Sequence, residues 1–150
     1  FICHLSFVIC HLLFVILFVI SNLSFYFMII GLGIDILELG HLRKILSFQE
    51  ESFLNYAFTE REIEYFHNKR GLEHLATTFT AKEAFIKAVP ISQSFCLKEI
   101  EVLREESGKP RINLAGNLAK QFPEDKFRFL LTSSFTQSIA VSVVIIEQNY

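Results

Sequence analysis

Hydrophobic residues are distributed along this chain in two different ways. Residues 1–27 are apolar almost throughout, whereas residues 28–150 alternate between apolar runs, helical periods and polar turns. The second part opens with an apolar run over residues 28–39, which predicts a buried strand interrupted by two glycines. Asp35 stands inside this run, and a carboxylate removed from water has to be paired, protonated or bound to a cation. Asp35 could equally cap the helix expected after the strand.

Helical patterns follow the first strand. Residues 47–50 and 59–62 both match the capping box, in which a hydroxyl and a carboxylate satisfy free amide groups at a helix start. The longest helix is expected over residues 72–89, because Pro90 cannot continue it.

The segment Phe79–Ala88 of this longest helix carries the most distinctive chemistry. Glu83 and Lys87 are four residues apart and therefore lie on one helix face, one turn from each other. Such a pair is most often an exposed ion pair worth about 0.3–0.5 kcal/mol. The same two side chains could instead hold a metal ion and a phosphate next to each other.

The remaining residues predict antiparallel strands. Apolar alternation and turn residues indicate a hairpin, a short helix and a closing hairpin at residues 97–114, 115–122 and 127–146. The turn of the closing hairpin is expected at residues 133–135. Antiparallel strands packed on a long central helix give an α+β fold, in one domain spanning residues 28–150.

Charge and cysteine content narrow the possible partners. All 14 basic and 16 acidic residues lie beyond Phe27, and the net charge is -2. A nucleic-acid-binding surface needs clustered, uncompensated Lys and Arg, so nucleic acid is not expected as a partner. Of the three cysteines only Cys96 belongs to residues 28–150, so no disulfide can form within the domain and a reducing, cytoplasmic compartment is expected.

Residues 1–27 are long enough to cross a bilayer as a helix, but they lack the basic flank of a signal peptide or an anchor. They also repeat, since Ile2–Phe7 recurs seven residues later as Ile9–Phe14. The only methionine, Met28, stands directly before the first strand. We therefore favour upstream sequence translated in front of the domain. A leader or a membrane anchor is the alternative, and a membrane partner is expected only in that case.

Four short motifs lie in order along the domain. Gly-x-Gly-x-Asp-Ile-x-Glu stands at residues 31–38, and Phe-x-Ala-Lys-Glu-Ala-x-x-Lys-Ala stands at residues 79–88. A Thr-x-x-Glu segment begins at Thr59, and a Gly-Lys-Pro turn begins at Gly108. In these motifs and their spacing the chain resembles the holo-acyl-carrier-protein synthases of the 4'-phosphopantetheinyl transferase superfamily.

The resemblance implies a Mg2+-dependent transferase of fatty acid biosynthesis with the fold of that superfamily. Its co-substrate would be coenzyme A, whose phosphopantetheine arm passes to a serine of an apo acyl carrier protein and leaves adenosine 3',5'-bisphosphate. Catalysis would depend on Asp35, Glu83 and Lys87, and the two carboxylates among them would hold Mg2+. The coenzyme would contact Lys82, Lys87, Gly108, Lys109 and Pro110.

The resemblance also implies partners. Carrier proteins are acidic, so docking would use basic side chains, for which the candidates are Arg43, Lys44, Lys69 and Arg70. The family commonly forms a homotrimer in which neighbouring subunits share each active site. Some apolar surface of this small domain would then face another copy of the chain.

Three positions depart from the family pattern. His41 stands six residues after Asp35, where an arginine is usual. Thr78 stands where an arginine is usual, and Phe135 follows Ser134 where a histidine is common. Thr78 and Phe135 favour a second interpretation, a degenerate module that binds carrier proteins without transferring anything. The retained Asp35, Glu83 and Lys87 oppose it. A third interpretation, a membrane-anchored interaction protein, depends only on residues 1–27.

Overall fold

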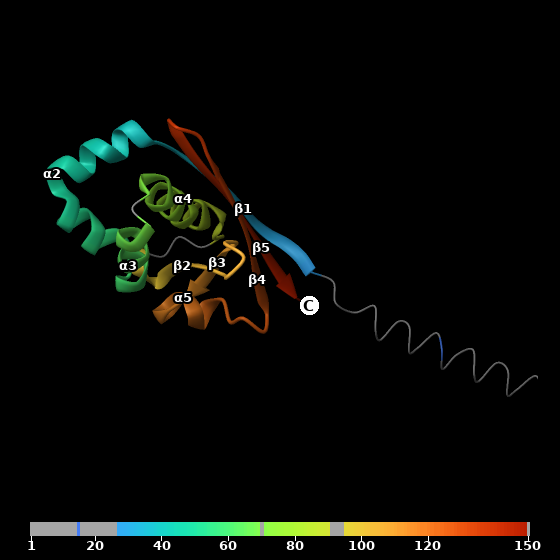
Figure 1. The fold of residues 1–150 in the computed structure, drawn as a ribbon. Coiled ribbons are helices and arrows are strands. Elements are labelled where there is room, and N and C mark those ends of the chain that lie inside the picture. Colours follow the sequence, from blue (N-terminus) through green and yellow to red (C-terminus); the bar gives the residue numbers. More distant parts are fainter. Residues whose placement is uncertain (1–14, 16–26, 70, 91–94, 150) are drawn as a thin grey trace, which may run out of the picture.

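The structure is a computed structural model that describes Val15 and residues 27–69, 71–90 and 95–149 (Figure 1). The elements in chain order are β1 (Phe27–Glu38), α2 (Leu39–Ala57), α3 (Glu60–Lys69), α4 (Leu72–Ala88), a 3-10 turn (Leu97–Glu99), β2 (Ile100–Arg104), β3 (Pro110–Leu114), α5 (Gly116–Gln121), β4 (Phe127–Phe135) and β5 (Ile139–Asn149). Strands β1, β5 and β4 form an antiparallel sheet in that order, and β2 pairs with β3 in a separate hairpin. The expected α+β fold is confirmed.

Helix α4 is the central element because it is buried on two sides. Figure 1 shows it between the long strands and the helices α2 and α3. One core cluster joins α4 to the sheet and the hairpin, with Phe85 and Val144 fully buried. A second cluster joins α4 to α2 and α3, with Leu42 and Phe58 fully buried. The helix ends at Ala88, close to the expected limit.

One of the two expected capping boxes forms. The Thr59 N–H donates to Glu62 Oε2 at 2.8 Å, and the Glu62 N–H donates to Thr59 Oγ1 at 3.3 Å. The expected box at Ser47 is wrong, because α2 is already under way there and the Ser47 hydroxyl donates to the Lys44 carbonyl instead. Helix α2 consists of two helical stretches joined by a kink at Gln49, where φ is -146° and ψ is 38°. A helical stretch therefore does begin near the expected place, but without the expected capping box.

Two strand limits also differ from expectation. Residues 97–99 form a 3-10 turn, so β2 begins only at Ile100. The turn of the closing hairpin is not at residues 133–135, because β4 runs on to Phe135, which pairs with Ala140. The Thr136 N–H donates to the Ile139 carbonyl at 2.8 Å and closes the turn beyond that pair.

Strand β1 is buried on one face only, so the prediction of a fully buried strand is wrong. Leu32, Ile34 and Ile36 are 62%, 55% and 65% exposed. Their shared spacing of two places them on one side of the strand, and α4 packs on the other side. Within the described residues no element covers this outer face.

No helix in the described part of the chain is long and apolar enough to cross a membrane. The expectation of an upstream segment, leader or anchor falls on residues 1–27, which lie outside the described residues except for Val15 and Phe27.

Candidate active site

Gly31 and Gly33 allow helix α4 to lie directly against strand β1. A Cβ atom on Gly31 would stand 2.0 Å from the carbonyl oxygen of Ala88, and one on Gly33 would stand 2.0 Å from that of Ala84. Side chains two residues apart point to the same side of a strand, so Asp35 faces the same helix. The glycines therefore bring the acid of the first motif to the helix that carries the second.

Lys87 meets Asp35 across this contact. Its Nζ atom donates to Asp35 Oδ1 at 2.6 Å, which joins α4 to β1 by an ion pair. The Lys87 side chain is 53% exposed and that of Asp35 is 15% exposed. Asp35 is therefore a paired carboxylate rather than a helix cap, since α2 has no side-chain cap at its start. The ion pair of Lys87 in the described structure is made with Asp35 and not with Glu83.

Glu83 lies partly buried beside this ion pair. Burial raises the pKa of its carboxyl above the ordinary value, the charge of Asp35 raises the pKa further, and the charge of Lys87 opposes both effects. The two carboxylates are thus close enough to repel each other. A cation bound between them would relieve this repulsion.

Asp35 and Glu83 fit magnesium in the type and number of their donor atoms. Magnesium usually takes one or two carboxylates and completes its shell with substrate phosphates and water. In the part of the chain that the structure describes, no group of three or more His, Cys, Asp or Glu side chains is placed to hold a metal. A magnesium ion held by these two carboxylates would therefore keep most positions open for phosphate oxygens.

Lys82 does not lie where coenzyme A could reach it. Its side chain is 0% exposed, and Nζ donates to Glu62 Oε2 at 2.7 Å, to the Ala57 carbonyl at 2.7 Å and to the Leu97 carbonyl at 3.3 Å. All three N–H donors of this ammonium are used inside the protein. Lys82 is next to Glu83 in sequence but points to the other side of α4, so we do not retain it as a coenzyme contact.

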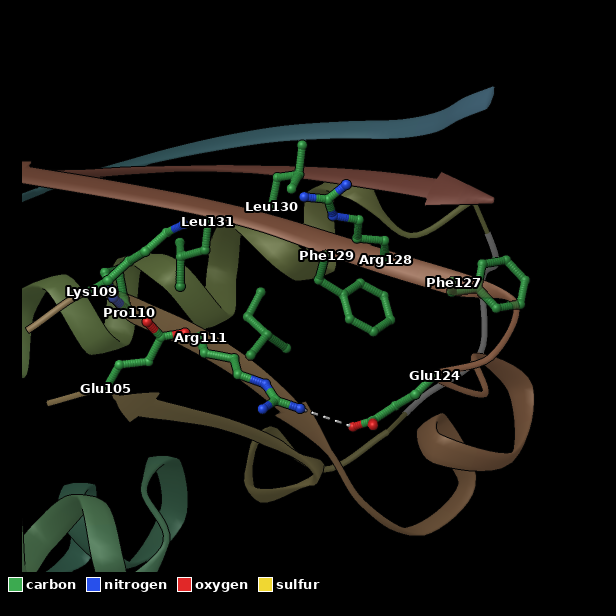
Figure 2. Close-up of a pocket in the computed structure, with 11 residues that line it drawn as sticks. Glu105, Lys109, Pro110, Arg111, Glu124, Phe127, Arg128, Phe129, Leu130 and Leu131 are labelled. Carbon is green, nitrogen blue, oxygen red and sulfur yellow. Dashed lines mark ion pairs between the residues drawn. The ribbon is translucent and has the colours of Figure 1, made fainter. Parts of the chain in front are cut away.

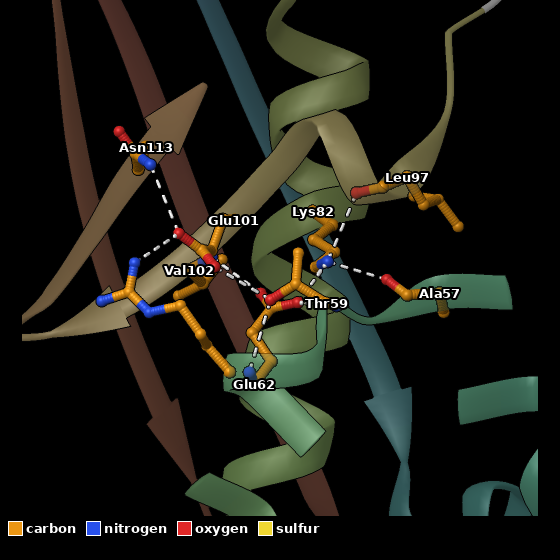
Figure 3. A network of polar contacts seen from close by, with 9 residues as sticks. Ala57, Thr59, Glu62, Lys82, Leu97, Glu101, Val102 and Asn113 are labelled. Atoms are coloured by element: carbon orange, nitrogen blue, oxygen red, sulfur yellow. Dashed lines mark hydrogen bonds and ion pairs between the residues drawn. The ribbon is translucent and has the colours of Figure 1, made fainter. Parts of the chain in front are cut away.

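The ammonium of Lys82 belongs to a buried polar network (Figure 3). Glu62 also accepts from the Val102 N–H at 2.7 Å, which ties α3 to β2. Nearby Glu101 accepts from the Thr59 hydroxyl at 3.0 Å and from Asn113 Nδ2 at 3.3 Å. The network joins α3, α4 and the hairpin.

The Gly-Lys-Pro turn borders a pocket of about 340 Å3 between the hairpin and β4 (Figure 2). Gly108 adopts a φ of 84°, which favours glycine, and its N–H donates to the Glu105 carbonyl at 2.8 Å. Lys109 and Pro110 line the pocket together with two arginines and two acids, Arg111, Arg128, Glu105 and Glu124. Arg111 is paired with Glu124 at 3.5 Å. The pocket lining is therefore of mixed charge, and the described contacts do not link the turn to Asp35.

The proposed docking residues are only partly described. Arg43 and Lys44 are exposed on the first half of α2. The side chain of Lys69 and the whole of Arg70 lie outside the described residues.

Two of the positions that depart from the family pattern, Thr78 and Phe135, have defined surroundings. Thr78 is 8% exposed and lines a small pocket against α3 and β2. Phe135 is 51% exposed, and its ring centre lies 6.3 Å from that of His74, which also meets Tyr65 at 5.8 Å. Sequence reasoning missed the Asp35–Lys87 ion pair. The available signal was that Gly31, Gly33 and Asp35 follow one another at a spacing of two, which places all three on one side of the strand.

Comparison with known proteins identifies the family. A model of the 4'-phosphopantetheinyl transferase superfamily matches residues 31–144. The chain therefore belongs to the 4'-phosphopantetheinyl transferase superfamily, which makes it a transferase.

The similar proteins are holo-[acyl-carrier-protein] synthases. One from Clostridium botulinum (strain Eklund 17B / Type B) is 39% identical over 122 residues, which cover 80% of this chain and 98% of the relative. A crystal structure from Bacillus anthracis in complex with coenzyme A (3',5'-ADP) is 30% identical, with a TM-score of 0.67 over 81% of this chain and 98% of that one. A structure from Neisseria meningitidis is 27% identical, with a TM-score of 0.74 over 81% of this chain and 100% of that one.

Proposed function

We propose that this chain transfers the 4'-phosphopantetheine arm of coenzyme A to a serine of an apo acyl carrier protein and releases adenosine 3',5'-bisphosphate. Family membership and the similarity to holo-[acyl-carrier-protein] synthases support this function. The structural observation that carries it is the meeting of Asp35, Glu83 and Lys87 where β1 lies on α4. This cluster offers two carboxylates and one ammonium group to a diphosphate.

Asp35 and Glu83 are the proposed ligands of Mg2+, which when bound supplies neutralising charge to the diphosphate and polarises the phosphoryl group under attack. The ammonium of Lys87 is half exposed and lies one turn beyond Glu83. We expect it to leave Asp35 for a phosphate oxygen when the coenzyme binds. Together the three side chains would orient the reacting phosphoryl group and neutralise the negative charge of its oxygens. Positioning and charge stabilisation are the main contributions to catalysis in such a transfer.

The nucleotide end of the coenzyme is proposed to contact Gly108, Lys109 and Pro110. The pocket beside this turn supports the proposal, because its three basic side chains outnumber the two acids, Glu105 and Glu124, that also line it. Its volume of about 340 Å3 is at the lower end of the roughly 300–1,000 Å3 range typical of small-molecule sites.

The carrier protein is proposed to dock on the basic residues Arg43 and Lys44, with Lys69 and Arg70 as further candidates. Exposure of the first two on α2 supports this, because α2 follows β1 directly and so starts close to Asp35. Such exposed charges mainly affect the rate at which the carrier protein associates with this chain, and how strongly that rate depends on salt.

A homotrimer is the proposed assembly. The outer face of the sheet supports self-association, because Leu32, Ile34 and Ile36 expose a row of large apolar side chains beside further apolar residues of β5. Apolar patches of this kind commonly mark protein interfaces. We propose an active site that neighbouring subunits share. The partner on this face is therefore a second copy of the chain.

Residues 28–150 are the proposed catalytic domain, and the matched range 31–144 supports this boundary. The cytoplasm is the proposed compartment, supported by the free thiol of Cys96.

A mass-shift assay tests the function directly. The full chain is incubated with coenzyme A, Mg2+ and an apo carrier protein, and the carrier should gain the mass of the phosphopantetheine arm. Asp35→Ala and Glu83→Ala should each slow the transfer by about 100-fold or more, because each removes a ligand that acts on the transition state. Glu106→Ala changes an exposed acid in the hairpin turn and serves as the matched control.

Two outcomes would contradict parts of this proposal. Full activity of both alanine variants would refute the assignment of the site. A carrier that binds the wild-type chain but never gains mass would favour the degenerate carrier-binding module instead.

A further inference from the structure

A cluster of three hydroxyl groups lies between α4 and the three-stranded sheet. Thr80 and Ser142 are 0% and 1% exposed, and their side-chain oxygens are 2.7 Å apart. Ser133 of β4 joins them, with its Oγ atom 2.8 Å from that of Ser142. The hydroxyls of Thr80 and Ser142 also each lie 3.2 Å from the Thr77 carbonyl oxygen. None of the three hydroxyls stands at a fixed position of the four sequence motifs.

The hydroxyl cluster is closed on itself. Each hydroxyl has one proton to donate and can accept up to two hydrogen bonds. Ser142 can donate to the Thr77 carbonyl. It then accepts from the other two hydroxyls, so all three protons are used within the cluster. No proton is left over for a ligand, and the cluster therefore joins two elements rather than forming a binding site.

Each of the two buried hydroxyls is next to one acid of the candidate active site. Ser142 is the cross-strand partner of Asp35, and the Cβ atoms of such partners lie about 4.5–5.5 Å apart on one face of a sheet. Thr80 stands three residues before Glu83, which places their Cβ atoms about 5–6 Å apart on one face of α4. The hydrogen bond between Thr80 and Ser142 therefore links the neighbour of one acid to the neighbour of the other.

The glycine contacts do not by themselves fix where α4 lies along β1. Gly31 faces the carbonyl of Ala88. Two residues on along the strand and one turn back along the helix, Gly33 faces the carbonyl of Ala84. Four helix residues rise about 6.0 Å and two strand residues about 6.6 Å, so a helix shifted by one turn would meet the glycines in nearly the same way. A directional hydrogen bond between two short side chains does not survive such a shift.

We propose that Thr80 and Ser142 are positioning residues. Their hydrogen bond sets the distance between Asp35 and Glu83 at which one divalent cation can bind both acids. This inference rests on the proposed function, which assigns Mg2+ to these two carboxylates. Both side chains reach their hydroxyl through a single torsion, and that of Thr80 is restricted by its branched Cβ. Their bond therefore couples the two backbones more tightly than the long side chain of Lys87 does.

Mg2+ binding to the full chain tests the positioning role without turnover. It is measured by isothermal titration calorimetry with coenzyme A present and no carrier protein. Thr80→Val keeps a similar shape and removes the hydroxyl, so it should weaken Mg2+ binding about three- to tenfold, the worth of one hydrogen bond. Ser142→Ala should weaken it similarly, and Thr80→Ser, which retains the hydroxyl, should bind like the wild type. Ser52→Ala removes an exposed hydroxyl of α2 and is the matched control.

Several results of the binding experiment would overturn the proposal. Urea unfolding first checks that each variant keeps its fold, and Ser142→Ala still gives the answer if Thr80→Val does not fold. Equal Mg2+ binding by the folded variants and the wild type would overturn the positioning role. A Thr80→Ser protein as weak as Thr80→Val would also overturn it, because the loss would then come from packing. A wild type that binds no Mg2+ would overturn both this role and the assigned metal site.

Kinetics then separate positioning from a general loss of structure. In Thr80→Val the Mg2+ concentration that gives half of the maximal rate should rise by the same factor as the dissociation constant, whereas the KM for the carrier protein should not change. Equal rises of both quantities would show a purely structural role and overturn the proposal.

The same measurements distinguish failure of this inference from failure of the proposed function. A chain whose Mg2+ binding depends on Thr80 and Ser142 but which transfers nothing would refute the proposed function and support the positioning role. A chain that transfers the arm while both variants require no more Mg2+ than the wild type would support the function and overturn the positioning role.

Discussion

Asp35 is paired with a cation and lies near a second carboxylate, and this arrangement sets the chemistry of the candidate active site. The ion pair with Lys87 compensates the charge of Asp35. The carboxyl of Glu83 is partly buried, and the charge of Asp35 repels its charged form. Glu83 is therefore held in a less favourable charged state than an exposed glutamate. That cost is removed when a cation binds between the two acids.

Because the charged form of Glu83 is disfavoured, we predict that Glu83→Gln raises the free energy of unfolding at neutral pH in the absence of divalent ions. Because folding raises the pKa of Glu83, the unfolding free energy of the wild type falls as pH rises from 4.5 through the raised pKa, and it stays lower above it. The variant should therefore be more stable at neutral pH and equal below pH 4.5, as measured by urea unfolding at several pH values. Glu106→Gln should show no such difference, and added Mg2+ should stabilise the wild type more than Glu83→Gln. A variant of equal stability at neutral pH would contradict the raised pKa.

Lys82 shows how a motif residue can be structural. Its buried ammonium is satisfied by Glu62 and two carbonyl groups, so Lys82→Met leaves a buried acid without its counter-charge. Removing one partner of a buried ion pair costs about 3–5 kcal/mol. Urea unfolding should report this loss, and adding Glu62→Gln should recover part of it. Lys98→Met, at an exposed lysine, is the control. A stable, normally folded Lys82→Met protein with a weaker affinity for coenzyme A would instead restore Lys82 as a coenzyme contact.

At the scale of elements, the packing of α4 on β1 decides whether the site exists. The helix approaches so closely that its carbonyl groups occupy the space where side chains of Gly31 and Gly33 would be. The buried network on the opposite side of α4 holds the helix in that position, through Lys82 and Glu62.

Gly33→Ala should therefore harm both stability and transfer. Its Cβ would stand 2.0 Å from the Ala84 carbonyl oxygen, so α4 has to move away from Asp35. Overpacking of this kind costs about 1–3 kcal/mol or more. Gly40→Ala is the matched control, because nothing lies within 4 Å of its Cβ and alanine favours the helix by about 0.5–1 kcal/mol. Unfolding midpoints should move in opposite directions for the two variants, and a Gly33→Ala protein with unchanged stability and activity would contradict the close approach.

At the scale of the whole molecule, the three-stranded sheet has one covered and one open face. Leu32, Ile34 and Ile36 form a continuous row of apolar side chains on the open face. Single exposed apolar residues are normal on a monomer, whereas a contiguous row of them indicates an interface. The proposed trimer gives this face a partner.

Ile34→Lys should disrupt the assembly, because a lysine placed in an apolar interface loses its hydration. Analytical ultracentrifugation should find a smaller species, and transfer activity should fall with it. Tyr56→Lys changes another exposed large side chain, which is 68% exposed on α2, and should leave the mass unchanged. A monomeric wild type with full activity would contradict the proposed assembly.

The sequence by itself determined the fold class and the order of the elements, and it predicted Asp35, Glu83 and Lys87 as the candidate site. Local patterns carry this information, since apolar periods define helices and strands, and the spacing of the motifs defines which acids and lysines belong together. It could not separate Lys82 from Lys87, because both stand in one motif and differ only in the side of the helix that they occupy.

Only the tertiary structure decided which face of β1 is open, which partner Lys87 takes and which hydroxyl Thr80 meets. Each of these depends on contacts between residues far apart in the chain. Asp35 and Lys87 are 52 residues apart, and they meet only because two glycines let one helix lie against one strand. The physical reason is that burial and pairing of a charge are set by its neighbours in space, which a local pattern does not contain.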